Sequence, residues 1–139
     1  MASKLISNLV RGQRNFISKN VSRSLSTSKT VRETFTIQDE DDFKERVINS
    51  PIPVIVDFSA TWCGPCKILG PRLEAAVAGT NSKVNLAIVD IDDNSDLAMD
   101  HEVQAVPTVV AFKGGQSVDK FIGLLDEDRL DAFVTKLHQ

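Results

Sequence analysis

The chain has 139 residues, of which 42% are hydrophobic, and this size and composition predict one globular domain rather than two. No apolar run approaches the roughly 18 residues that a membrane-spanning helix needs, which excludes insertion into a membrane. The formal net charge is −3, but it is divided unevenly between the two ends of the sequence.

The N-terminal segment, residues 1–32, carries seven basic side chains, seven serines and no acidic residue. Drawn as a helix, it places apolar residues such as Leu5 and Leu9 on one side and basic residues on another. This composition is typical of a mitochondrial transit peptide, and "RSLS" resembles a matrix-protease site that predicts cleavage near residue 25. The alternative is a disordered basic tail that binds anionic surfaces.

The remaining residues, 33–139, hold nine basic and nineteen acidic side chains, a net charge of −10. A domain of this charge repels phosphate, which argues against nucleic-acid binding. The break in charge therefore predicts a cleaved leader, residues 1–32, followed by a folded domain, residues 33–139.

The folded part alternates strand and helix patterns along the chain. "ETFTI" predicts a strand, and "DEDDFKERVINS" predicts a helix with an acidic start that ends before Pro51. "VIVDFS" is a nearly all-apolar strand, typical of burial on both faces, and it leads into a helix over "CKILGPRLEAAVAG". "VNLAIVDID" is a third strand, and "SDLAMDHEV" is a helix that Ser95 opens.

The last third of the sequence predicts a hairpin and a closing helix. "TVVAFKGGQSVDKFIG" is expected to form two strands joined by a tight turn at Gly114 and Gly115. "DEDRLDAFVTKLHQ" is an amphipathic helix with acidic residues in its first turn. The order βαβαβαββα predicts an α/β fold with a mixed central sheet and helices on both faces.

Both cysteines of the chain, Cys63 and Cys66, lie in "WCGPCK". As a structural crosslink they would close almost no loop and stabilise little. A zinc site would need four ligands, and His101 and His138 lie far from the pair in sequence, in polar stretches that predict solvent exposure. A redox-active pair fits this spacing better than either alternative.

The expected position of the two cysteines at the start of a helix favours thiol–disulfide chemistry. Cys63 is expected at the helix N-terminus, where unpaired backbone N–H groups favour the thiolate, with its sulfur exposed to attack. Cys66 lies one turn deeper and can resolve the mixed disulfide formed at Cys63. Gly64 is expected to let the turn form without Cβ clashes, and Pro65 fixes φ in the first turn.

These motifs resemble the thioredoxin family. The resemblance rests on "WCGPCK", the "VDF" before it, Pro71 after it and "VPT" 40 residues later, and it runs from about Thr34 to the C-terminus. "DIDDNSDLA", "VDKF" and "DEDRLDAF", together with the leader, are most similar to mitochondrial members of the family.

The resemblance implies the thioredoxin fold and reduction of protein disulfides by dithiol–disulfide exchange, without a bound cofactor. It implies an NADPH-dependent thioredoxin reductase as electron donor and peroxiredoxins among the clients. It makes Cys63 the attacking thiol, Cys66 the resolving thiol and Asp57 a buried proton carrier below Cys66. The residues that it implies in substrate binding are Trp62, Gly64, Pro65, Val106, Pro107 (as a cis-proline) and Gly123.

Two of these residues have a simpler explanation, and two other positions depart from the family pattern. Trp62 could be a core aromatic, but its place beside the cysteines favours a partly exposed ring. Gly123 is most simply explained by a close backbone approach. Ser59 stands where the family often has tryptophan, and Ile88 where many members have a buried lysine, so the pKa of Asp57 is expected to be raised by burial without a cation to oppose it.

Two other functions remain open at this point. Disulfide isomerases and oxidases tend to carry histidine or another residue at the place of Pro65, and the reducing mitochondrial matrix argues against them. A thioredoxin-fold binding module would hold partners without turnover, and the presence of both cysteines and Asp57 argues against it. The leading hypothesis is a disulfide reductase of the mitochondrial matrix.

Overall fold

The computed structural model describes residues 34–139; the predicted leader and its cleavage site lie outside these residues. The elements follow the predicted order βαβαβαββα: β1 (Thr34–Thr36), α1 (Glu40–Phe43) continued by a π-type turn η3 (Lys44–Ile48), β2 (Val54–Ser59), α2 (Gly64–Ala78), β3 (Asn85–Asp90), α3 (Ser95–Asp100), β4 (Thr108–Lys113), β5 (Gln116–Ile122) and α4 (Glu127–Leu137). Within this part of the chain, no helix has both the length and the apolar character to cross a membrane.

The five strands form one mixed sheet in the order β1-β3-β2-β4-β5, with β2 at its centre. β2 runs parallel to β3 and antiparallel to β4, which places Asp57 between Ile88 and Val109. β4 and β5 form the predicted hairpin, and Gly114 and Gly115 at its turn have φ angles of 62° and 80° that favour glycine.

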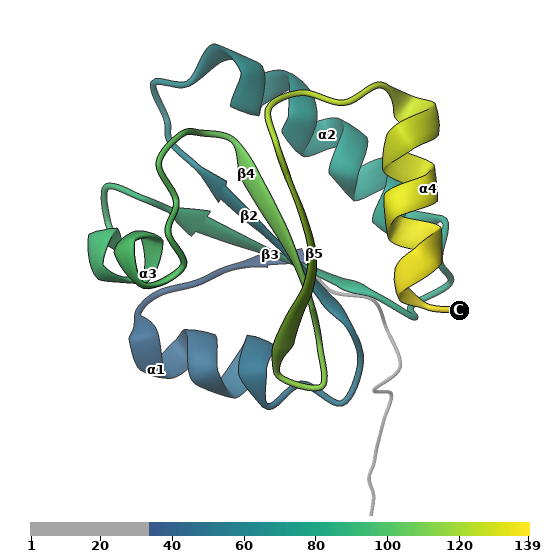
Figure 1. Cartoon of the computed structure of the whole chain (residues 1–139), viewed down its shortest axis with the longest axis horizontal. Coiled ribbons are helices and arrows are strands. Elements are labelled where there is room, and N and C mark those ends of the chain that lie inside the picture. The colour runs from purple at the N-terminus through teal and green to yellow at the C-terminus, as the bar shows by residue number, and fades with distance from the viewer. Residues whose placement is uncertain (1–33) are drawn as a thin grey trace, which may run out of the picture. The chain divides into compact units, whose positions relative to one another are not determined.

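Helices α2 and α4 lie over one face of the sheet, and α1 and α3 lie over the other (Figure 1). β2 contributes to both cores because its side chains alternate: Val56 and Phe58 belong to the α1/α3 core, whereas Ile55 belongs to the α2/α4 core. The burial of β2 on both faces, predicted from "VIVDFS", is confirmed. Asp57 shares the α2/α4 face with Ile55.

Capping side chains accept short-range hydrogen bonds at the starts of α1 and α4, whereas the N-cap residue of α3 makes no such bond. The Asp39 side chain accepts a hydrogen bond from the Asp42 N–H at 2.8 Å, so the acidic start of α1 acts as its N-cap. Asn94, rather than Ser95, occupies the N-cap position of α3, and this helix ends at Asp100, earlier than its sequence pattern suggested. At α4, the Asp126 side chain accepts from the Arg129 N–H at 2.9 Å.

The prediction that His101 is solvated is only partly right, because its side chain is half-buried against the core. Its ring lies 5.1 Å from that of Phe43, 5.9 Å from that of Phe58 and 5.5 Å from that of Phe112, measured between centroids. Desolvation lowers the pKa of His101, and the nearby Asp100 carboxylate opposes that effect. Its polar neighbours in the sequence did not reveal this partial burial, which arises because the residue that follows α3 packs against the core.

Candidate active site

The two cysteines form a disulfide at the N-terminus of α2. Cys63 is the N-cap residue, and its Sγ accepts a hydrogen bond from the Cys66 N–H at 3.2 Å. The same N–H group and the helix dipole would favour a thiolate at Cys63 when the pair is reduced. The Cα atoms lie 5.4 Å apart, within the ordinary range for a disulfide, so the pair is placed to open and close with little movement of the backbone.

The expected difference in exposure between the two cysteines is not found. In this disulfide form Cys63 is 4% exposed and Cys66 is 7% exposed, so neither sulfur stands clear of its surroundings. Both side chains pack with Ala60, and the partly buried Ile91 and Val106 cover the same cluster. Any preference for Cys63 as the attacking thiol therefore comes from the helix start rather than from greater exposure of its residue.

The two residues between the cysteines lie in the first turn of α2. Pro65 stands where its missing N–H costs no helical hydrogen bond, as predicted. The predicted reason for Gly64 is wrong: its φ angle is not in the positive range, and a Cβ there would meet no atom within 4 Å. Gly64 therefore leaves open surface directly beside the disulfide.

Asp57 is a buried carboxyl group in the middle of the sheet. It is 3% exposed, and its Oδ1 has no hydrogen-bond partner. Burial alone raises the pKa of Asp57 to about 7, because taking the carboxylate out of water disfavours its charged form. Asp57 lies on the same face of the sheet as Ile55, the face that α2 covers, and the buried stripe of α2 begins at Cys66.

Ile88 lies directly beside Asp57 in the parallel pairing of β2 with β3. Since paired residues of neighbouring strands point to the same face, the side chain next to the carboxyl is apolar and supplies no cation. The raised pKa that the sequence predicted for Asp57 agrees with this placement.

The residues around the nearly buried cysteines differ in exposure: Trp62, Gly64 and Pro65 are exposed, whereas Val106 is partly buried and Pro107 is buried. Trp62, directly before Cys63, is 66% exposed, so the alternative of a core aromatic is excluded. The peptide bond between Val106 and Pro107 is cis, as the resemblance implied, and the Val106 side chain packs against the cysteine cluster.

Gly123 is joined to these residues by its backbone. Its N–H donates a hydrogen bond to the Pro107 carbonyl at 2.9 Å. The explanation by a close backbone approach is wrong, because a Cβ at this position would meet nothing within 4 Å. Glycine is favoured here by a φ angle of +91°, and the space beside it stays open.

The family model named Thioredoxin matches residues 34–136, nearly the whole of the described domain. The chain is 57% identical over 121 residues to the mitochondrial thioredoxin of Bos taurus, covering 87% of this chain and 73% of the relative. It is 58% identical over 115 residues to the mitochondrial thioredoxin of Mus musculus, covering 83% and 69%.

The chain belongs to the thioredoxin family. Two solved thioredoxins share its fold. The thioredoxin of Malassezia sympodialis is 36% identical with a TM-score of 0.69, covering 82% of this chain and 98% of the other. A mutant thioredoxin of Halobacterium salinarum is 32% identical with a TM-score of 0.71, covering 82% and 96%. With its cysteine pair at disulfide distance, this thioredoxin is a dithiol–disulfide oxidoreductase.

Two residues that lie beside the cysteine pair were not predicted from the sequence. Ile91 packs against the cysteine cluster, and the Asp92 carboxylate accepts a hydrogen bond from the Trp62 indole at 2.9 Å. Both residues directly follow β3, which runs parallel to β2. Because parallel neighbouring strands end at the same edge of a sheet, the turn after β3 could have been expected beside the loop that carries the cysteines.

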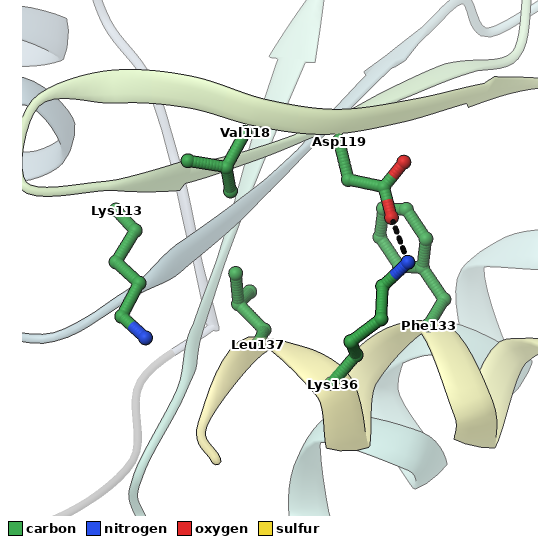
Figure 2. Close-up of a pocket in the computed structure, with 6 residues that line it drawn as sticks. All are labelled: Lys113, Val118, Asp119, Phe133, Lys136 and Leu137. Atoms are coloured by element: carbon green, nitrogen blue, oxygen red, sulfur yellow. Dashed lines mark ion pairs between the residues drawn. The ribbon is translucent and has the colours of Figure 1, made fainter.

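A pocket of about 210 Å³ lies at the opposite end of the sheet, between β5 and α4 (Figure 2). At one side of it, Lys136 Nζ lies 3.1 Å from an oxygen of Asp119. β4 starts beside Phe58, near the cysteine loop, and ends beside Val54, so the hairpin that lines this pocket is remote from the disulfide. The pocket is therefore not part of the thioredoxin site.

No group of three or more His, Cys, Asp and Glu side chains is placed to hold a metal ion among residues 34–139.

Proposed function

We propose that this thioredoxin reduces disulfides of client proteins in the mitochondrial matrix, with Cys63 as the attacking thiol and Cys66 as the resolving thiol. The proposal rests mainly on the Cys63–Cys66 pair at the start of α2, where the Cys63 sulfur accepts a hydrogen bond from the Cys66 N–H. A helix N-terminus stabilises negative charge, so of the two sulfurs the one at the N-cap is the better thiolate.

The exchange proceeds in two steps. The Cys63 thiolate attacks one sulfur of the client disulfide, that bond breaks, and the second client sulfur leaves as a thiolate that takes up a proton. Cys66 then loses its proton and attacks the Cys63 sulfur, which closes the Cys63–Cys66 disulfide and releases the first client sulfur as a thiol. Two electrons have passed from the dithiol to the client, and the solvent supplies the protons of the two client thiols.

Asp57 serves as the proton carrier of the second step. In support, its carboxyl group lies on the face of the sheet that α2 covers, and burial raises its pKa to about 7, so near neutral pH it can both accept and donate a proton. It accepts the Cys66 proton during client reduction. When an electron donor reopens the disulfide, the protonated carboxyl returns a proton to the Cys66 sulfur.

Clients bind over the surface around the disulfide. Trp62 supplies an exposed ring, Gly64 and Pro65 present an open first turn of α2, and Val106 and Pro107 offer the cis segment whose backbone pairs with the client. Gly123 extends this surface, since its N–H binds Pro107 and no Cβ fills the space beside it.

An NADPH-dependent thioredoxin reductase is the proposed electron donor, and peroxiredoxins are proposed among the clients. In support, the chain is 36% identical over 102 residues to a Mycobacterium leprae protein named as a bifunctional thioredoxin reductase/thioredoxin, although it spans only 22% of that protein. No bound cofactor is proposed for this chain.

The proposed location follows from the leader and from the relatives. The mammalian relatives are named mitochondrial thioredoxins, and the cattle match of 121 residues is longer than the domain 34–139, so it includes part of the basic segment. We propose cleavage near Leu25 after import. N-terminal sequencing of the protein from mitochondria tests this, and recovery of a chain that starts at Met1 would contradict it.

The proposed reaction is tested by trapping. Cys66→Ser should accumulate mixed disulfides between Cys63 and clients, because the resolving thiol is missing, and mass spectrometry identifies the linked cysteines. Cys63→Ser is the matched control and should trap none. A double variant, Cys63→Ser with Cys66→Ser, separates reduction from binding: if it keeps the cellular function, the protein is a binding module.

A further inference from the structure

The Trp62 indole is fixed by a hydrogen bond that spans the active site. Its Nε1–H donates to the Asp92 Oδ2 at 2.9 Å, although the two residues are thirty positions apart in the chain. The ring is 66% exposed, so packing against the core does little to hold it. A largely exposed side chain would otherwise exchange between rotamers, and this bond favours one orientation of the ring beside Cys63.

Asp92 is itself held in place by the turn after β3. Its backbone N–H donates to the Asp90 Oδ1 at 2.8 Å. The Ile91 N–H donates to the Ser59 carbonyl at 3.0 Å, which ties this turn to the end of β2, the strand that leads to Trp62. The carboxylate that binds the indole therefore sits on an anchored backbone.

The same turn also touches the reacting pair. The Ile91 side chain packs on the cluster that contains Cys63 and Cys66, while Asp92, the next residue, reaches Trp62. The turn formed by residues 90–92 thus contacts both the buried disulfide and the exposed ring beside it.

We propose that Asp92 is a positioning residue, whose carboxylate holds the Trp62 indole as a fixed wall of the client surface and so accelerates the reduction of protein disulfides over small ones. This inference rests on the proposed function. A client that meets a fixed ring does not have to immobilise it on binding. Immobilising one such side chain at an interface weakens association about threefold to tenfold. A small disulfide, which needs little contact with the ring, should not show this difference.

The test compares Asp92→Ala, which removes the hydrogen-bond acceptor, with Asp92→Asn, whose amide oxygen can still accept from the indole. Asp93→Ala is the matched control, because Asp93 is an exposed acidic residue of the same turn for which the structure gives no bond to Trp62. Trp62 is the single tryptophan of the chain, so time-resolved fluorescence anisotropy reports on its ring alone.

Two substrates are compared: insulin as the protein disulfide and 5,5′-dithiobis(2-nitrobenzoate) as the small one. In Asp92→Ala we expect a more mobile indole and a kcat/KM for insulin that is about threefold to tenfold lower, mainly through KM. The rate with the small disulfide should be unchanged. Asp92→Asn and Asp93→Ala should match the parent protein in both assays and in anisotropy.

A second variant approaches the bond from its other end. Trp62→Phe leaves the turn at residues 90–92 intact but removes the N–H donor. Adding Asp92→Ala to it should lower the insulin rate no further, since the bond is already absent. If Asp92→Ala alone folds poorly, the single variant Trp62→Phe still tests the proposal, because it removes the N–H donor without altering the turn and should itself lower the insulin rate.

The proposal is overturned if the ring of Asp92→Ala is as rigid as in the parent, or if the ring is freed and insulin reduction is unchanged. Equal losses with both substrates overturn it too, because Asp92 would then act on the dithiol. An additional loss on the Trp62→Phe background likewise contradicts it. A parent protein that reduces no protein disulfide refutes the proposed function itself, whereas a parent active on insulin with an unimpaired Asp92→Ala refutes this inference alone.

Discussion

The two faces of the sheet each contain an ionisable side chain in a setting that disfavours its charge. On the α2/α4 face, Asp57 is 3% exposed with an unpaired Oδ1, and its pKa is raised to about 7. On the α1/α3 face, His101 lies among three phenylalanine rings, and its pKa is lowered. Desolvation is the main cause in both cases.

The two ionisable groups differ in their neighbours. Asp57 shares its face with the start of α2, where Cys66 opens the buried stripe, whereas His101 shares its face with apolar side chains of the core. A perturbed pKa therefore does not mark a functional residue by itself. For its titration to affect the reaction, an ionisable side chain must lie on the same face of the sheet as a reacting group.

The comparison is tested most strongly by the rate of disulfide reduction. We expect Asp57→Asn to slow the reduction of insulin at neutral pH by at least about tenfold, because a positioned proton carrier contributes about 10²- to 10⁴-fold to a reaction. His101→Phe, the matched substitution on the other face, should leave the rate unchanged. Equal rates for Asp57→Asn and the parent would remove the functional half of the comparison.

Asp57→Asn is expected to slow the reaction but to raise the free energy of unfolding at neutral pH. The folded protein holds the Asp57 proton up to about pH 7, while the unfolded chain loses it near pH 3.8, so the free energy of unfolding falls as pH rises between these values. Above pH 7 the cost approaches about 4 kcal/mol. The amide of Asp57→Asn avoids it, but a buried amide that lacks partners costs about 1–3 kcal/mol itself.

We therefore expect Asp57→Asn to raise the free energy of unfolding by about 1–3 kcal/mol at about pH 8, and to lose this advantage near pH 4. Urea denaturation of both proteins across this range measures the difference. A gain of the same size at every pH would show that the carboxyl is not the titrating group.

A cation at position 88 should lower the raised pKa of Asp57. Ile88→Lys places an ammonium beside the carboxyl in the strand register, and a cation within reach lowers a carboxyl pKa by about 1 or more. Ile88→Met is the control, since it adds an unbranched chain without charge. Carbon-detected NMR titration of the Asp57 carboxyl follows the change, and an unaltered titration in the lysine variant would show that the ammonium does not reach Asp57.

The smallest effect is expected at His101. Because its folded pKa is lowered, the unfolded chain binds a proton before the folded protein does, so stability is lost as pH falls through about 6.5. His101→Phe should abolish this loss and change stability at neutral pH by less than about 1 kcal/mol. Measuring both proteins on the Asp57→Asn background removes the carboxyl titration, and a persistent acid slope in the phenylalanine variant would assign it to another group.

Much of this molecule was determined by local sequence. Hydrophobic periodicity and turn residues predicted the order of strands and helices, because side-chain alternation and helix spacing are properties of neighbouring residues. The redox character of Cys63 and Cys66 could also be predicted, since the spacing and the helix start lie within one short segment. The apolar run around Asp57 likewise predicted its raised pKa.

Only the tertiary structure decided the contacts between distant segments. Three features depend on the order of the strands and the length of the loops: the bond between Trp62 and Asp92, the hydrogen bond from Gly123 to Pro107, and the partial burial of His101. The low exposure of Cys63 has the same origin, because Val106 and Ile91 cover the pair from two other loops. Such contacts follow from register and packing across the sheet, which no short stretch of sequence specifies.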